Sequence, residues 1–150
     1  MPCDFNLSTV ISAGIASIVA SSVSLLVASR NKRAQERAKL LDYIMQINQL
    51  AIQYPYFEED SFCDSWHRDK CQSDERYQRY ENFCCIVFNV LEDLWRHFKG
   101  EKCKMEEFFG VKEMIMRHSK WLHDSTAKKE NVDGYNLAFL EFIDDYLQQK

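Results

Sequence analysis

The segment Glu75–Gly100, ERYQRYENFCCIVFNVLEDLWRHFKG, decides the fold class of this chain of 150 residues. Apolar side chains recur along it every three to four residues, which is the period of one face of a helix. Asp74 is a suitable N-cap and Gly100 a suitable stop, so the segment predicts a long helix with a buried face. That face comprises Tyr77, Tyr80, Phe83, Cys84, Val87, Phe88, Leu91, Leu94, Trp95 and Phe98.

Three further segments repeat the helical period. Residues 30–53 predict an amphipathic helix that ends at Tyr54-Pro55, because the residue before a proline disfavours the helical conformation. Residues 105–123 predict another helix, and Asp133 is a candidate cap for a last one that reaches Leu147. No stretch alternates long enough to predict a strand. The sequence therefore predicts an all-α protein with a bundle of about four main helices.

Composition restricts the possible classes of protein. The chain carries a net charge of −4 and is 46% hydrophobic, with four glycines and two prolines. These values disfavour a disordered chain, a collagen and a turn-rich β fold. The sequence pI near 5.6 also disfavours a general nucleic-acid binder, which usually presents a basic face. We therefore expect no DNA partner, and the acidic composition also disfavours an RNA partner.

The N-terminal part contains an uncharged stretch, residues 7–29. A helix of this length spans roughly 34 Å, which exceeds a bilayer core of about 30 Å. Asp4 and no basic residue precede it, which disfavours a cleaved secretory signal. A buried core helix is the other alternative. The stretch predicts a transmembrane helix, preceded by a short translocated N-terminus, residues 1–6.

A basic flank follows this stretch and sets the expected orientation. Residues 30–53 carry five positive and two negative groups, a net +3, whereas residues 54–150 carry fourteen and twenty, a net −6. Positive flanks stay in the cytoplasm and attract anionic lipids. We expect a single-pass inner-membrane protein of bacterial type, with a juxtamembrane helix at 30–54, a cytoplasmic domain at 55–150 and the lipid bilayer as a partner. The flank comprises Arg30, Lys32, Arg33, Arg37 and Lys39.

Small residues recur within the uncharged stretch at spacings of four and three. Such spacing places them near one helical face, where small side chains allow two helices to approach closely. The pattern indicates self-association, although a chain rich in Ala and Ser also produces such a stripe by chance. The stripe comprises Ala13, Ser17, Ser21, Ser24 and Ala28.

No metal site or cofactor is predicted. Cys63, His67 and Cys71 recur every four residues, so on one helix they drift around the axis and do not converge on one ion. A closed zinc site needs a fourth ligand, and no Cys-x-x-Cys pair is present. The cysteines are instead expected to be small thiols in or near the core.

The segment Arg117–His123 resembles the Arg-x(4–6)-His signature of HEPN-type ribonucleases. The resemblance implies a helical bundle in which His123 acts as general acid–base and Arg117 stabilises phosphate charge. His118, directly after the arginine, also fits the pattern. The alternative is that Arg117 and His123 are surface groups on a bundle helix.

An acidic and aromatic stretch follows Pro55 and predicts a turn with a short helix. Its aromatic residues are candidate anchors for a protein partner, since aromatic side chains flanked by acids resemble interface hot spots. The alternative is a hydrophobic plug that closes one end of the bundle. The candidates are Tyr56, Phe57, Phe62 and Trp66.

The organisation of the chain resembles small, uncharacterised bacterial proteins with one membrane anchor and a helical domain, including effectors of phage defence. The resemblance implies a non-enzymatic interaction or sensor protein that forms oligomers. The ribonuclease that uses Arg117, His118 and His123 remains the alternative function.

Overall fold

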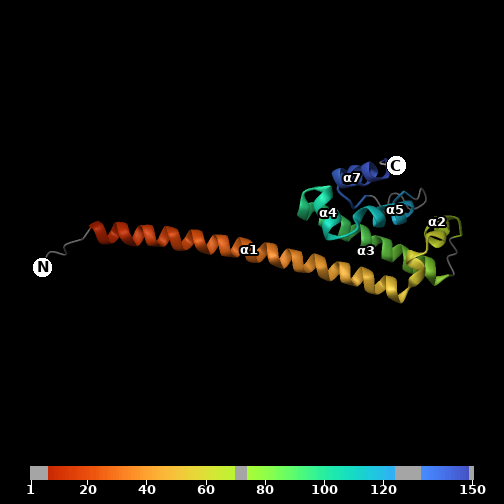
Figure 1. Cartoon of the computed structure of the whole chain (residues 1–150), viewed down its shortest axis with the longest axis horizontal. Helices are drawn as coiled ribbons and strands as arrows, with labels where there is room; N and C mark the ends of the chain where they lie inside the picture. Colours follow the sequence, from red (N-terminus) through yellow and green to blue (C-terminus); the bar gives the residue numbers. More distant parts are fainter. Residues whose placement is uncertain (1–6, 70–73, 124–132, 149–150) are drawn as a thin grey trace. The chain divides into compact units, whose positions relative to one another are not determined.

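The computed structural model describes residues 7–69, 74–123 and 133–148, and the side chains of 21–66, 74–123 and 133–148. These described residues form helices and no strand (Figure 1), which confirms the all-α prediction. The elements in chain order are α1 (Leu7–Gln53), the 3-10 helix η1 (Pro55–Glu58), α2 (Asp60–Asp69), α3 (Glu75–Phe98), α4 (Lys102–Phe108), α5 (Val111–Leu122) and α7 (Leu137–Gln148).

Two compact units make up the chain, Met1–Lys39 and Leu40–Lys150, and α1 contributes residues to both. The helix ends at Gln53, directly before Tyr54-Pro55, as the sequence predicts. Proline has no backbone N–H and restricts the residue before it, so the helical hydrogen-bond ladder stops there.

Helix α3 confirms the prediction for residues 75–99. The Asp74 carboxylate accepts a hydrogen bond from the backbone N–H of Arg76 at 2.9 Å and so caps the N-terminus. At the other end Lys99 and Gly100 both adopt positive φ, 53° and 74°, and the Gly100 N–H donates to the Trp95 carbonyl. This left-handed ending satisfies carbonyls that the last turn leaves free.

The single helix predicted at 105–123 is wrong, because the structure divides this segment into α4 and α5. Phe109 is fully extended, with φ −159° and ψ 139°, and Gly110 begins the next helix. The Glu106 carboxylate accepts a hydrogen bond from the Lys112 N–H at 2.7 Å, which satisfies a donor in the first turn of α5. The apolar period continues across the break, so periodicity alone does not reveal it.

The predicted cap of the last helix is also wrong. Asn136, not Asp133, caps α7: its Oδ1 accepts a hydrogen bond from the Ala138 N–H at 2.9 Å. The buried Glu92 carboxylate of α3 accepts a second bond from the Asn136 N–H, also at 2.9 Å. The start of α7 is thus tied to α3.

Helix α5 occupies the centre of the unit Leu40–Lys150, because it contacts α2, α3, α4 and α7. The core is built from aliphatic and aromatic side chains of every described element of this unit. Burial of such side chains supplies the main driving force for folding. The largest of those that are fully buried include Trp66, Tyr80, Phe57, Phe83, Phe88, Phe139, Ile47, Leu91 and Leu94.

The prediction of a transmembrane helix, and with it of a single-pass inner-membrane protein with a cytoplasmic bundle, requires correction. Among the described residues, no helix is both long enough and apolar enough to cross a bilayer. A spanning helix needs about 20 apolar residues. Residues 7–20 of the predicted span lie outside the described side chains.

Candidate functional site

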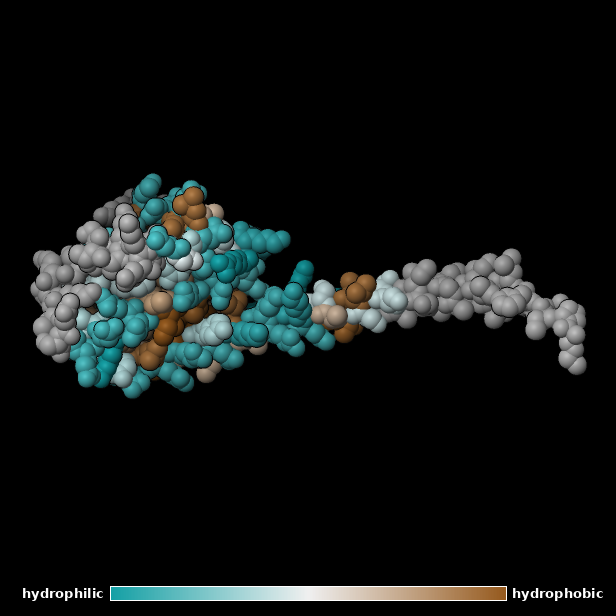
Figure 2. Space-filling model, turned by 180° about the vertical axis from the view of Figure 1, so that it is seen from behind, coloured by the Kyte–Doolittle hydropathy of each residue, from teal (hydrophilic) through white to brown (hydrophobic). Residues whose placement is uncertain are grey.

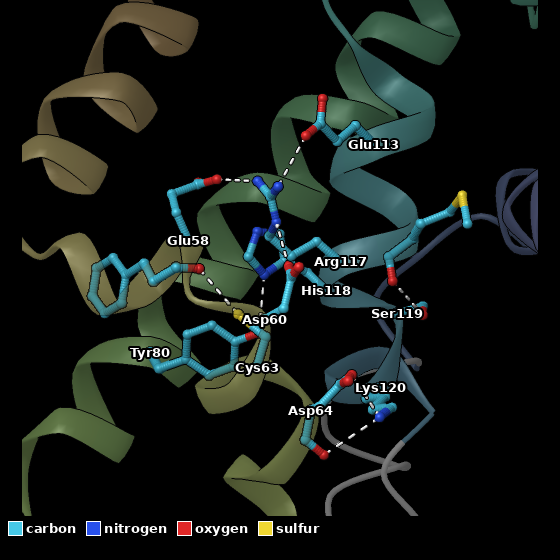
Figure 3. A network of polar contacts seen from close by, with 12 residues as sticks. Glu58, Asp60, Cys63, Asp64, Tyr80, Glu113, Arg117, His118, Ser119 and Lys120 are labelled. Carbon is cyan, nitrogen blue, oxygen red and sulfur yellow. Dashed lines mark hydrogen bonds and ion pairs between the residues drawn. The ribbon is translucent and has the colours of Figure 1, made fainter.

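Arg117 is the centre of a polar network that joins three elements (Figure 3). From α5 its guanidinium reaches Glu58 of η1 and Asp60 of α2, with Nε 3.3 Å from Asp60 Oδ1. Its Nη2 lies 2.9 Å from Glu113 Oε1, one turn earlier on α5. Contact between α5 and α2 brings the carboxylates of the acidic–aromatic stretch to this arginine.

The ion pairs of the network keep Arg117 charged and hold its guanidinium against the carboxylates. Burial acts to lower the pKa of Arg117, but attraction by Glu58, Asp60 and Glu113 outweighs it and the net pKa is raised. Only 20% of the side chain is exposed. A guanidinium already paired with three carboxylates is not free to bind a phosphate.

His118 points the other way, into the core. It is fully buried, and its Nδ1 lies 2.9 Å from the Tyr80 hydroxyl oxygen. Its Nε2 has no hydrogen-bond partner among the described residues. Burial, assisted by the positive charge of Arg117, lowers the pKa of His118 to about 4, so the ring is neutral near pH 7.

The thiol of Cys63 completes the buried side of the network. It donates a hydrogen bond to the Phe57 carbonyl at 3.1 Å. Burial raises the pKa of Cys63, and burial also raises that of Cys84. Since the thiolate is the nucleophilic form, these raised pKa values disfavour nucleophilic chemistry at both thiols.

His123 lies at the C-terminal end of α5 and contacts a different part of the bundle. Its Nε2 is 3.1 Å from Asp144 Oδ1 of α7, and its Nδ1 is 2.9 Å from the Ser119 carbonyl oxygen. Arg117 faces η1 and α2, whereas His123 faces α7. The structure therefore directs the two residues of the predicted ribonuclease motif to separate partners, and places His118 between them in the core.

Two surface cavities of about 550 Å³ each border the Arg117 network. Both are lined by Gly110, Glu113 and Arg117, so they adjoin, and together we call them the Arg117 groove. The apolar part of the lining includes Ala51, Ile52, Phe109, Met114 and Met116. The charged part comprises Glu58, Asp60, Asp64, Glu106 and Glu113, with Lys112 and Arg117.

The aromatic candidates for partner binding divide into two groups. Phe57 is 1% exposed and Trp66 is fully buried, so these two are core residues and not surface anchors. Tyr56 and Phe62 are half-buried and stack edge-on, with ring centroids 5.1 Å apart. The predicted anchor role is therefore corrected for Phe57 and Trp66, which pack as a hydrophobic plug.

The basic flank is exposed along α1, from Arg30 to Lys39, and Lys32 lies 4.0 Å from Glu36 one turn away. Of the small-residue stripe, Ser21, Ser24 and Ala28 are exposed, whereas Ala13 and Ser17 lie outside the described side chains. The described residues hold no group of three or more ligands suited to a metal ion, and Cys71 lies outside them.

No family model, no curated protein and no solved structure matches this chain. The site therefore rests on its own geometry. Sequence reasoning missed the partners of Arg117, although Glu113 four residues earlier on the same helix is a recognisable ion-pair spacing. Glu58 and Asp60 are distant from Arg117 in the sequence, so no helical spacing links them to it.

Proposed function

We propose that the protein acts without catalysis, as a helical module that binds a partner protein in the Arg117 groove. The observation that carries the proposal is the combination of an apolar lining and an acidic rim in two adjoining cavities. Concave sites with apolar walls and a few placed polar groups are the usual form of binding sites.

The charge of the groove indicates a basic partner. Five carboxylates and two basic groups line it, a net −3, and Lys120 outside the lining pairs with Asp64 at 2.6 Å. A segment with Lys or Arg beside apolar residues complements this surface, as an amphipathic helix lying in a groove does.

The apolar surface of the groove is open to such a segment. Ile52 is 79% exposed and Met116 is 50% exposed. Figure 2 shows that hydrophobic residues reach the surface of the molecule as patches amid hydrophilic ones. Patches of this kind mark interaction sites, and methionine adapts its shape to different partners.

A titration with model peptides tests this proposal. A labelled amphipathic peptide of Lys and Leu heptads is expected to bind the full chain, whereas a Glu and Leu counterpart is not. Met116→Arg is expected to weaken binding about tenfold, by repulsion and lost apolar contact. The matched control is Ile86→Arg, which alters an exposed apolar residue of α3 away from the groove. Binding that Met116→Arg leaves unchanged would contradict the proposal.

The ribonuclease alternative is not supported by a specific observation, because Arg117 is occupied and His118 is buried. Incubation of the full chain with single-stranded and structured RNA is expected to give no cleavage. Cleavage that disappears in both Arg117→Ala and His123→Ala would instead establish the alternative and refute a non-enzymatic role.

A further inference from the structure

The part of α1 in the unit Leu40–Lys150 has three distinct faces. Leu40, Ile44 and Ile47 are buried in the core, and the glutamines at 46, 49 and 53 form an exposed polar face. A third face carries Leu41, Met45, Asn48 and Ile52, all exposed. Leu41 is 45% exposed, Met45 58% and Ile52 79%.

The spacing of this third face is that of a coiled coil. Its positions follow one another by four, three and four residues, and the same alternation continues towards the N-terminus through Ala38, Ala34, Asn31 and Val27. Apolar positions at these intervals over at least about three heptads are typical of helices that pair with one another. We call the eight positions from Val27 to Ile52 the seam. In heptad notation Asn31, Ala38, Met45 and Ile52 are a positions, and the other four are d positions.

We propose that the seam pairs with the seam of a second copy of this chain in a parallel, in-register coiled coil. A helix whose apolar stripe is its own complement forms a closed, two-fold symmetric interface. Asn48 and Ile52 belong to both the seam and the Arg117 groove, so a second copy and a groove partner compete for them.

Charges beside the seam favour a second copy and select its direction. Arg37 occupies the g position before Ala38, and Asp42 occupies the e position after Leu41. In a parallel pair each g side chain faces the next e side chain of the other helix, so Arg37 meets Asp42 of the second copy twice. An antiparallel pair that overlaps along the whole seam aligns g with g and sets Arg37 opposite Ile44 of the second copy, so it lacks this ion pair.

The seam contains two polar residues, Asn31 at an a position and Asn48 at a d position, and the first of them indicates the same arrangement. In parallel pairs an asparagine at a bonds to its counterpart across the interface and penalises shifted registers, so it specifies alignment at a cost in stability.

Sedimentation velocity of the full chain over a micromolar concentration series tests the pairing. We expect a reversible shift from 17.8 kDa to twice that mass. Met45→Glu is expected to weaken dimerisation at least about tenfold. Its matched control is Gln46→Glu, which adds the same charge on the polar face and is expected to leave the dimer intact. A single species at 17.8 kDa overturns the proposal, and so does association that Met45→Glu leaves unchanged, which would implicate the small-residue stripe.

Two further variants test direction and register. Arg37→Glu and Asp42→Arg are each expected to weaken the dimer, and the two together to restore it. Leu41→Cys, in a chain with Cys3, Cys71, Cys85 and Cys103 replaced by serine, is expected to form a disulfide between copies on mild oxidation. Equivalent d positions lie within disulfide reach only in a parallel, in-register pair. A dimer without this cross-link, or without rescue in the double variant, overturns the parallel arrangement.

Discussion

His118 occupies a place that solvent does not reach, beside the Tyr80 hydroxyl. One ring nitrogen is bonded, and the other has no partner in the described part of the chain. Leaving such a group unsatisfied costs about 1–3 kcal/mol, so His118 carries a local energetic penalty. The same burial keeps the ring neutral, which gives stability a definite dependence on pH.

Acidification is expected to destabilise the bundle through His118. The pKa falls from 6.5 to about 4 on folding, so the unfolded chain binds a proton between these values and the folded chain does not. Stability is therefore highest above pH 6.5 and declines as the pH falls towards 4, by roughly 3 kcal/mol. Urea unfolding at pH 7 and pH 4.5 measures the decline.

His118→Gln removes the titrating group, so its free energy of unfolding is expected to fall less between the two pH values than that of the native chain. An identical decline in both proteins would assign the effect to the surface carboxylates instead.

Helix ends in this bundle depend on particular backbone conformations. Gly100 has φ +74°, and a Cβ there would lie 3.0 Å from Nε1 of Trp95. Gly100→Ala is expected to cost about 1–2 kcal/mol, from both strain and contact. Gly110→Ala is the control, because open space surrounds its Cβ position. Thermal unfolding compares the two, and equal losses would contradict the assigned role of Gly100.

The start of α7 provides a test between two possible caps. Asn136→Ala removes the bond to the Ala138 N–H and is expected to lower the free energy of unfolding by about 1 kcal/mol. Asp133→Ala is expected to change it by less than about 0.5 kcal/mol, as for other surface positions. Denaturant unfolding decides, and a larger loss for Asp133→Ala would restore the cap expected from the sequence.

Arg117 connects segments that are distant in the sequence, so it affects the unit Leu40–Lys150 as a whole. Arg117→Met leaves Glu58 and two further carboxylates without their shared cation, and is expected to cost about 1–3 kcal/mol. The control is Arg76→Met, whose ion pair with Asp74 is local and exposed. Arg76→Met is expected to leave the free energy of unfolding nearly unchanged, because solvent screens an exposed ion pair. Equal costs in urea unfolding would show that the network contributes no more than a surface pair.

A feature of this structure was predictable from the sequence when the residues that determine it lie close together along the chain. Helix α3 was predictable because its apolar period, cap and stop all lie within one segment. The break between α4 and α5 was not, since a single extended residue, Phe109, leaves the period nearly intact. Glu58 lies 59 residues from Arg117, and no local pattern predicts that pair.

Composition also did not predict which aromatic side chains of the stretch after Pro55 are buried. Phe57 and Tyr56 are neighbours with the same kind of side chain, yet only Phe57 stacks on Phe83 of α3, with ring centroids 4.5 Å apart. Which ring enters the core depends on how η1 meets α3, and that is a property of the assembled bundle.

The aromatic surroundings of His118 also make it a natural spectroscopic reporter. The rings of Tyr80 and Phe83 flank it, with centroids 5.7 and 5.4 Å from that of the imidazole. Ring currents from these neighbours displace the proton resonances of His118 from those of a histidine in water. A one-dimensional proton NMR spectrum can therefore show, without any label, whether the interior remains assembled in each variant that keeps His118.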